Sequence, residues 1–280
     1  MGGNWFGGNW FGGNWFGGNW AGGSGGGGAP VFAMRADRPL AEIAITRSYD
    51  AKFRDAEWDP DLRAITILPE FLAQNIGGQQ WQAAVALPPP TYPVTPNMID
   101  EVLVLAVAER PEALGEIVEE DQNFQLRWLQ LLNISPAAYP HTFLLMKIVA
   151  RVGEFTMVKL KLQYSNMGGA APPPYWYQPR PNQVCATLYP PVQVPGHPAY
   201  PAGHALIGTL TSECLADLLP QYKEPLRALA ARVAMNRVIA GLHYRQDIDA
   251  GARAALALKP FLTACPFYAS TFALAQTEWT

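Results

Sequence analysis

Two of the four histidines in this chain stand where they could do chemistry. Asp247 follows His243 by four residues, so its carboxylate could hydrogen-bond the imidazole if a helix starts here. A carboxylate on one ring nitrogen fixes the tautomer and leaves the other nitrogen free as a nucleophile. Taken alone, the segment could equally be a surface ion pair at helical spacing.

His204 comes directly after Pro201, Ala202 and Gly203, and directly before an apolar segment that begins at Ala205. A glycine before a helix start offers free backbone N–H groups and the positive end of the helix dipole. Together these features outline an anion-binding site. A histidine in this position could also be a cap or a surface residue.

Two arginines could supply positive charge to the same site. Arg180 lies between Pro179 and Pro181, which stiffen the backbone and hold the guanidinium at low entropic cost. Arg237 lies about two helical turns before His243. A guanidinium binds phosphate oxygens in a bidentate manner, which lysine cannot do. Arg180 could instead cap loop carbonyls.

These side chains need a scaffold, and from Asn97 onward the hydrophobic periodicity predicts helices. Met98, Val102, Leu103 and Val107 mark one apolar face. A second helix is expected from Pro111 towards Leu132, and a third over about 141–162. Four later helices are expected at about 203–219, 222–241, 245–258 and 261–276. Residues 171–203 hold 10 of the 26 prolines and cannot be regular helix. We therefore expect an all-α bundle with a long Pro-rich loop over the active-site end.

The first 28 residues are expected to take no part in the chemistry. Residues 1–28 repeat a Gly-Gly-Asn-Trp unit at a period of five before a Gly/Ser run, and contain no titratable side chain. They could be an engineered tag with a linker, or a native low-complexity segment that self-associates through aromatic rings. Residues 29–280 are expected to form one helical domain. Within it, residues 29–97 would be loops and short helices, with Ala64–Leu68 as a short strand or extended segment.

Composition narrows the classes of partner. A formal net charge of −3 argues against non-specific electrostatic binding to nucleic acid. The three cysteines, Cys185, Cys214 and Cys265, are too scattered for a disulfide framework or a zinc site. The most apolar stretch, Ala205–Leu219, is interrupted by polar residues, so we expect a soluble protein without a membrane span. Nothing in the chain distinguishes a periplasmic from a cytoplasmic location.

The three segments resemble, in the same order, the signature motifs of one superfamily. It joins type 2 phosphatidic acid phosphatases, bacterial class A acid phosphatases and vanadium haloperoxidases. The first motif is Lys, six residues, Arg-Pro, matched by Arg180 and Pro181. Pro201–His204 resembles the second motif, Pro-Ser-Gly-His. The third is Ser-Arg, five residues, His, three residues, Asp, matched by Arg237, His243 and Asp247. The resemblance covers roughly residues 140–258.

Three positions depart from the family pattern. Pro173 stands where the first motif has its lysine, and Lys159 or Lys161 could replace it only through an insertion. Ala202 and Asn236 replace the serines of the second and third motifs. These changes would remove one charge and weaken two hydrogen bonds to a bound anion.

The resemblance implies a phosphatase that needs no cofactor and acts on a small phosphate ester. His243 would attack phosphorus in line and form a phosphohistidine, Asp247 would hold its ring, and His204 would protonate the leaving oxygen. The oxyanion would be held by Arg180, Arg237 and the backbone N–H of Gly203. Two alternatives are a vanadium haloperoxidase, with vanadate in the same pocket and His243 as its axial ligand, and a relative that only binds or self-assembles.

Overall fold

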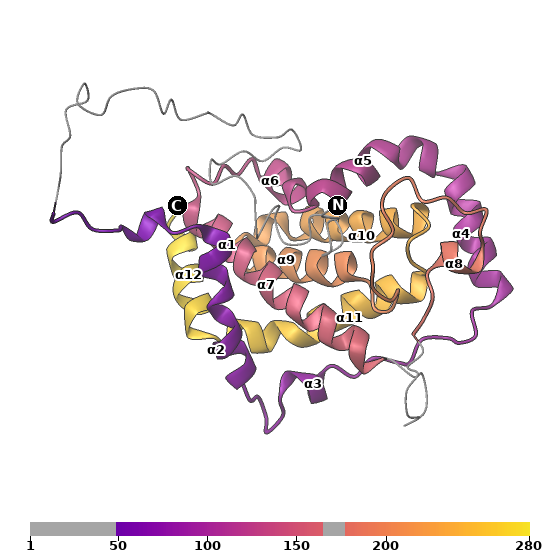
Figure 1. Ribbon diagram of the computed structural model, residues 1–280. Coiled ribbons are helices and arrows are strands. Elements are labelled where there is room, and N and C mark those ends of the chain that lie inside the picture. The colour runs from indigo at the N-terminus through magenta and orange to yellow at the C-terminus, as the bar shows by residue number, and fades with distance from the viewer. Residues whose placement is uncertain (1–48, 165–176) are drawn as a thin grey trace, which may run out of the picture.

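The computed structural model describes residues 49–164 and 177–280 and shows a helical bundle (Figure 1). Over these residues the only β-type pairing is a single bridge between Ile76 and Gln79, which confirms the all-α prediction. No helix within this part of the chain has the length and apolar character needed to cross a membrane. The N-terminal repeat, the proposed boundary after residue 28 and Pro173 lie outside the described residues.

Most of the helices fall near the predicted ranges. In chain order they are α1 (Pro60–Ile65), α2 (Ile67–Ala73), α3 (Trp81–Ala84), α4 (Pro96–Ala108), α5 (Arg110–Asn123), α6 (Leu126–Leu132), α7 (Pro140–Gln163), α8 (Pro181–Val184), α9 (Gly203–Leu218), α10 (Lys223–Ile239), α11 (Arg245–Thr263) and α12 (Pro266–Gln276). Short 3₁₀ turns cover Asp55–Glu57 and Pro220–Tyr222.

Helix α9 forms the centre of the bundle. It is buried on all sides along most of its length, and its buried residues include polar ones as well as apolar ones. It packs against α7, α10 and α11, which surround it in Figure 1. Leu206, Ile207, Leu210 and Leu215 bring it into the main hydrophobic core. The residues that begin α9 are therefore held rigidly at one end of the bundle.

A glycine ends α10 and sets the start of α11. Gly241 has a φ of 79°, a left-handed conformation that favours glycine, and its N–H donates to the Val238 carbonyl at 2.8 Å. The chain then turns, and Asp247 accepts a 3.0 Å hydrogen bond from the N–H of Tyr244 to cap α11. His243 lies in the turn between these two signals, so local sequence alone fixes its position relative to both helices.

The prediction of a strand or extended segment at Ala64–Leu68 is wrong. Here α1 ends at Ile65 and α2 begins at Ile67. Asp59 caps α1 by accepting the N–H of Leu62 at 3.0 Å. Ala64 and Ile67 are fully buried, and both helices pack on α7. Packing of this apolar surface outweighs the strand preference of the β-branched residues.

Two other predicted helices have different bounds. The helix expected from Pro111 to Leu132 is divided into α5 and α6 between Asn123 and Leu126. Helix α11 continues through Pro260 to Thr263, beyond its predicted end at residue 258. Residues 185–202 form the irregular Pro-rich loop, and Figure 1 shows it across the end of the bundle where α10 meets α11. The prediction of a loop at this end is confirmed for the described residues, except that the single-turn helix α8 lies within the range that was expected to be irregular.

The contact between α9 and α11 yields the first testable prediction. A Cβ added at Gly251 would lie 2.4 Å from the carbonyl oxygen of Ala202 and 3.0 Å from the backbone nitrogen of Leu206. Since both atoms are backbone, the two helices must separate to admit it. We expect Gly251→Ala to lower the free energy of unfolding by about 1–3 kcal/mol, measured by urea denaturation.

Gly115→Ala is the matched control, because a Cβ there meets nothing within 4 Å. A glycine in a helix interior costs about 0.5–1 kcal/mol relative to alanine, so this variant is expected to be slightly more stable than the wild type. Equal stability of Gly251→Ala and the wild type would contradict the close packing of α9 on α11.

Candidate active site

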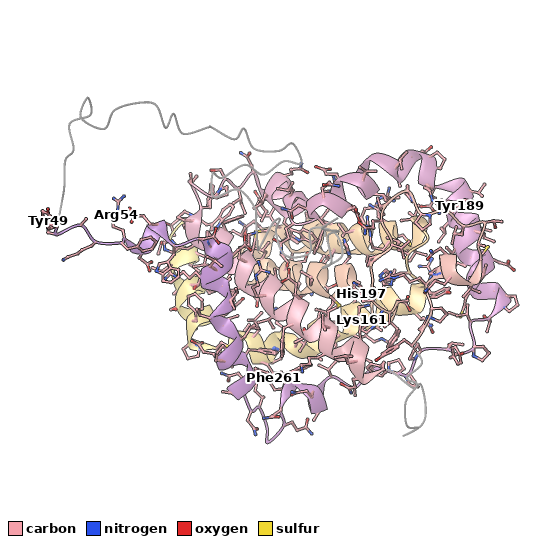
Figure 2. All side chains as sticks on the ribbon, in the orientation of Figure 1. Tyr49, Arg54, Lys161, Tyr189, His197 and Phe261 are labelled. Atoms are coloured by element: carbon pink, nitrogen blue, oxygen red, sulfur yellow. The ribbon has the colours of Figure 1, made fainter. Side chains whose placement is uncertain are left out.

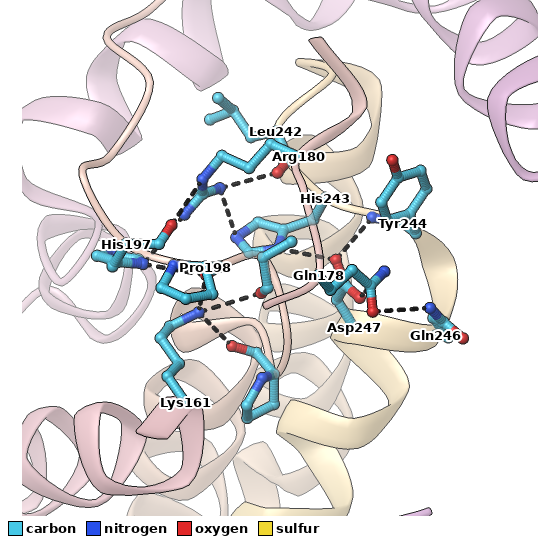
Figure 3. A network of polar contacts seen from close by, with 12 residues as sticks. Lys161, Gln178, Arg180, His197, Pro198, Leu242, His243, Tyr244, Gln246 and Asp247 are labelled. Atoms are coloured by element: carbon cyan, nitrogen blue, oxygen red, sulfur yellow. Dashed lines mark hydrogen bonds and ion pairs between the residues drawn. The ribbon is translucent and has the colours of Figure 1, made fainter. Parts of the chain in front are cut away.

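The residues singled out by the three motifs converge at one end of the bundle. Figure 2 places Lys161, near the C-terminal end of α7, beside His197 of the Pro-rich loop. Figure 3 shows the polar network that connects them to Arg180, His243 and Asp247. The network therefore joins segments that lie far apart in the sequence, from α7, the Pro-rich loop and the turn before α11.

His243 and Asp247 form a buried pair. The Nδ1 atom of His243 lies 3.2 Å from Oδ2 of Asp247, and this same oxygen accepts the N–H of Tyr244 at 3.0 Å. The other carboxylate oxygen accepts a 3.2 Å hydrogen bond from Nε2 of Gln178. On its other side the ring meets Arg180, which only donates, so the lone pair is on Nε2 and the imidazole proton is on Nδ1, facing Asp247.

Arg180 faces the other side of the same imidazole. Its Nη1 atom lies 3.3 Å from Nε2 of His243 and donates to the carbonyl of Leu242 at 2.8 Å. Its Nε donates to the carbonyl of His197 at 3.1 Å, and Nη2 lies 3.1 Å from Nδ1 of the His197 ring. Arg180 is 1% exposed, so a positive charge is fixed directly beside Nε2 of His243.

Lys161 brings a second buried cation that the motif spacing did not locate. Its Nζ donates to the carbonyls of Pro198, Ala199 and Pro201 at 2.6, 3.1 and 2.7 Å. These three bonds use all of its donors. In the sequence Lys161 is too far from Arg180 for the family spacing, so only the fold brings it to the site.

His197 was also missed. The sequence shows it only as one of four histidines within a Pro-rich loop, with no spacing to any other candidate. In the structure it holds Arg180 through both its carbonyl and its ring. Burial, and then the charges of Lys161 and Arg180, lower the pKa of His197 to about 3. Its ring is therefore neutral and can accept a hydrogen bond from the guanidinium.

The second motif lies where the sequence predicts. Gly203 is the first residue of α9, and the N–H of Ala202 donates to the backbone carbonyl of Asp247 at 2.9 Å. His204 is buried, hydrogen-bonds the backbone of Glu120 and lies against Phe124, with ring centroids 4.6 Å apart. The positive end of the α9 dipole is therefore directed towards the end of the bundle that holds His243.

Arg237 is buried but is held by acidic side chains that were not expected. Its Nη2 donates to the carbonyl of Ile117 at 3.0 Å and lies 3.5 Å from the carboxylate of Glu120. Its Nη1 is 3.7 Å from Asp121. Among the described residues, Nε and Nη1 have no hydrogen-bond partner. Arg237 thus has donors that could bind an anion and acids that oppose it.

Asn236, which stands where the third motif has its serine, directs its amide to two acidic side chains of α5. Its Nδ2 donates to Glu116 at 2.9 Å and to Glu120 at 2.8 Å. Asn236 therefore ties α10 to α5. No local pattern predicts this contact, because Glu116 and Glu120 lie more than a hundred residues earlier.

Electrostatics in the site favour neutral imidazoles. Burial, together with the charges of Arg180 and Lys161, holds the pKa of His243 well below its usual range. Burial and Arg237 do the same for the pKa of His204. Burial raises the pKa of Asp247 to about 7, opposed by the Tyr244 N–H and the nearby cations. Burial also lowers the pKa of Arg180 to about 10 and that of Lys161 well below its usual value.

Residues that could hold a metal ion do not gather in the described chain. No group of three or more His, Cys, Asp or Glu side chains there is arranged to bind one. The groups that do gather are Lys161, Arg180 and Arg237, with His243 between a carboxylate and a guanidinium. A cluster of this kind suits a doubly charged oxyanion.

Comparison with known proteins gives a local sequence match. Over 53 residues the chain is 36% identical to a non-specific acid phosphatase of Salmonella typhimurium (strain LT2). The matched segment covers 19% of this chain and 21% of that protein. The chain thus matches about a fifth of the length of this curated relative. No protein-family model matches the chain.

A structural comparison gives a distant likeness. The crystal structure of a transmembrane PAP2 type phosphatidylglycerolphosphate phosphatase from Bacillus subtilis aligns with 73% of this chain and 94% of its own, at 14% sequence identity and a TM-score of 0.28. A TM-score of 0.28 does not establish a common fold. The chain is thus similar to an acid phosphatase over 53 residues.

Proposed function

We propose that this protein is a phosphatase that hydrolyses small phosphate monoesters, with His243 as the nucleophile. The observation that carries the proposal is the buried imidazole between Asp247 and Arg180. Asp247 orients the ring through Nδ1, and the low pKa of His243 keeps Nε2 unprotonated. The lone pair of Nε2 accepts from Arg180, a contact that the incoming phosphoryl group would replace. The fixed charge of Arg180 beside this nitrogen would attract the phosphoryl group that it attacks.

The proposed reaction has two steps. In the first, Nε2 of His243 attacks phosphorus, an N–P bond forms and the ester P–O bond breaks, while the leaving oxygen takes a proton from His204. In the second, His204 takes a proton from water, which attacks phosphorus and releases His243 and inorganic phosphate. The low pKa of His204 favours its neutral ring, and a phosphate dianion beside it would raise that pKa, so that the ring gains its proton as substrate binds.

Three groups would hold the equatorial oxygens of the phosphoryl group. Arg237 supplies its Nε and Nη1 donors, which have no hydrogen-bond partner among the described residues, and Arg180 supplies its charge and the one N–H of Nη2 that His197 does not use. The N-terminus of α9 at Gly203 supplies a backbone N–H and the helix dipole. Lys161 would replace the charge of the missing first-motif lysine. Because its own donors go to three loop carbonyls, it would act through its charge and through the loop that it holds.

The nucleophile assignment is tested with a chromogenic phosphate ester. We expect His243→Ala to lower kcat/KM by about 10³-fold or more, since no other group can form the covalent bond. Asp247→Asn keeps an oxygen acceptor but loses the charge behind the ring, so a smaller loss of about 10²-fold is expected. A folded His243→Ala protein with wild-type activity would rule out the mechanism.

The role of Lys161 is tested with its neighbour on the same helix as control. Lys161→Met keeps the apolar stem and removes the charge, so we expect the inhibition constant of inorganic phosphate to rise about tenfold. Lys159 is exposed and lies over the ring of Phe155, so Lys159→Met removes an equal charge away from the site. Equal inhibition constants in both variants would show that Lys161 does not act on the anion.

Vanadate provides a test of the pocket itself. In-line attack by His243 passes through five-coordinate phosphorus, a shape that vanadate adopts readily, so we expect binding in about the micromolar range. Calorimetric titration should show this binding in the wild type and its loss in Arg237→Ala and His243→Ala. Absence of binding at millimolar vanadate would exclude both a phosphatase and a haloperoxidase. Halide oxidation by peroxide that depends on added vanadate would favour the haloperoxidase.

A further inference from the structure

Glu120 is a buried acid on α5 that belongs to none of the three motifs. Its carboxylate lies 3.5 Å from Nη2 of Arg237 and accepts a 2.8 Å hydrogen bond from Asn236. Its backbone bonds the ring of His204. Its side chain is fully buried, so the residue is not a solvated surface acid. It connects the second and third motifs through one point on α5.

We propose that Glu120 is a positioning residue that holds Arg237 and Asn236 at the site and competes with the bound oxyanion for the charge of Arg237. The inference rests on the proposed function. The carboxylate of Glu120 and the carbonyl of Ile117 both contact Nη2 of Arg237. These contacts fix where the remaining donors, Nε and Nη1, can point.

The competition follows from charge. A guanidinium that already faces a buried carboxylate attracts a second anion less strongly than an unpaired one does. A doubly charged oxyanion also repels Glu120, because little water lies between them to screen the interaction. Binding of the oxyanion should therefore be tighter when the carboxyl is neutral, and the bound oxyanion should in turn raise the affinity of Glu120 for a proton.

The charges that face Glu120 come from several helices. Arg237 on α10 and Arg127 on α6 favour its ionised form, and Glu116 on α5 opposes it. Asp121 is beside it in sequence and also faces Arg237, and His204 on α9 contacts its backbone. Burial outweighs the cations and raises the pKa of Glu120 to about 7. Glu120 is thus mostly neutral below that pH and mostly charged above it.

Tungstate is a suitable probe, because this tetrahedral oxyanion keeps a constant double charge across the neutral range. The experiment is calorimetric titration of tungstate into the full chain between about pH 6 and about pH 8.5, in the wild type and in Glu120→Gln. We expect Glu120→Gln to bind about as tightly as the wild type at the lower pH, and about fivefold to tenfold more tightly at the upper pH.

Glu119→Gln is the matched control. It removes an equal charge from the adjacent position on α5, where Glu119 contacts Arg127 and Gln130 and not Arg237. Its pH profile is expected to follow that of the wild type. A second variant, Asn236→Ser, removes the amide donor to Glu120 and keeps the carboxyl. Since this donor lowers the pKa of Glu120, its loss should move the decline in affinity to higher pH.

The outcomes separate this inference from the proposed function. If the wild type binds tungstate and the profiles of Glu120→Gln and the wild type are parallel, the competition proposed for Glu120 is wrong and the phosphatase proposal stands. Loss of tungstate binding at every pH in a folded Glu120→Gln protein would show that the carboxylate only positions Arg237, and would also overturn the competition. A wild type that binds no oxyanion and hydrolyses no ester would overturn the proposed function, and this inference with it.

Discussion

Positive charge buried at one end of a helical bundle is the constraint on which the other features of the site depend. Lys161, Arg180 and Arg237 are each 3% exposed or less. Removing a cation from water costs several kcal/mol unless other groups take over its solvation. Different groups replace water around each cation. Loop carbonyls surround Lys161, carbonyls and imidazole nitrogens surround Arg180, and carboxylates face Arg237. A bound oxyanion would be a further partner shared by all of them.

This constraint explains why a loop without regular structure can be ordered. Proline has no N–H, so a Pro-rich segment cannot form a hydrogen-bond ladder and leaves many carbonyls without backbone partners. In residues 185–202 these carbonyls face the cations: those of Pro198, Ala199 and Pro201 accept from Lys161, and that of His197 accepts from Arg180. The loop satisfies the cations, and the cations hold the loop. The functional site and the irregular segment are therefore stabilised by the same contacts.

The sequence predicts those parts of the site whose partners are near in the chain. The His243 and Asp247 pair, the helix start at Gly203 and the helix end at Gly241 depend on spacings of a few residues, and the structure has them as predicted. Contacts between residues far apart in the chain, such as Lys161 with Pro198, have no spacing from which the sequence predicts them. The error at Ala64–Leu68 has the same origin, because burial against α7, a distant helix, decided its conformation.

Asp247 shows how closely folding and chemistry are joined here. One of its oxygens accepts both the N–H of Tyr244, which caps α11, and the bond from the His243 ring. Its backbone carbonyl accepts the N–H of Ala202, which precedes α9. The contacts that start α11 therefore also orient the imidazole and fix the distance between the second and third motifs. One residue at a helix start performs all three tasks, so the packing of α9 on α11 sets how the second and third motifs lie relative to each other.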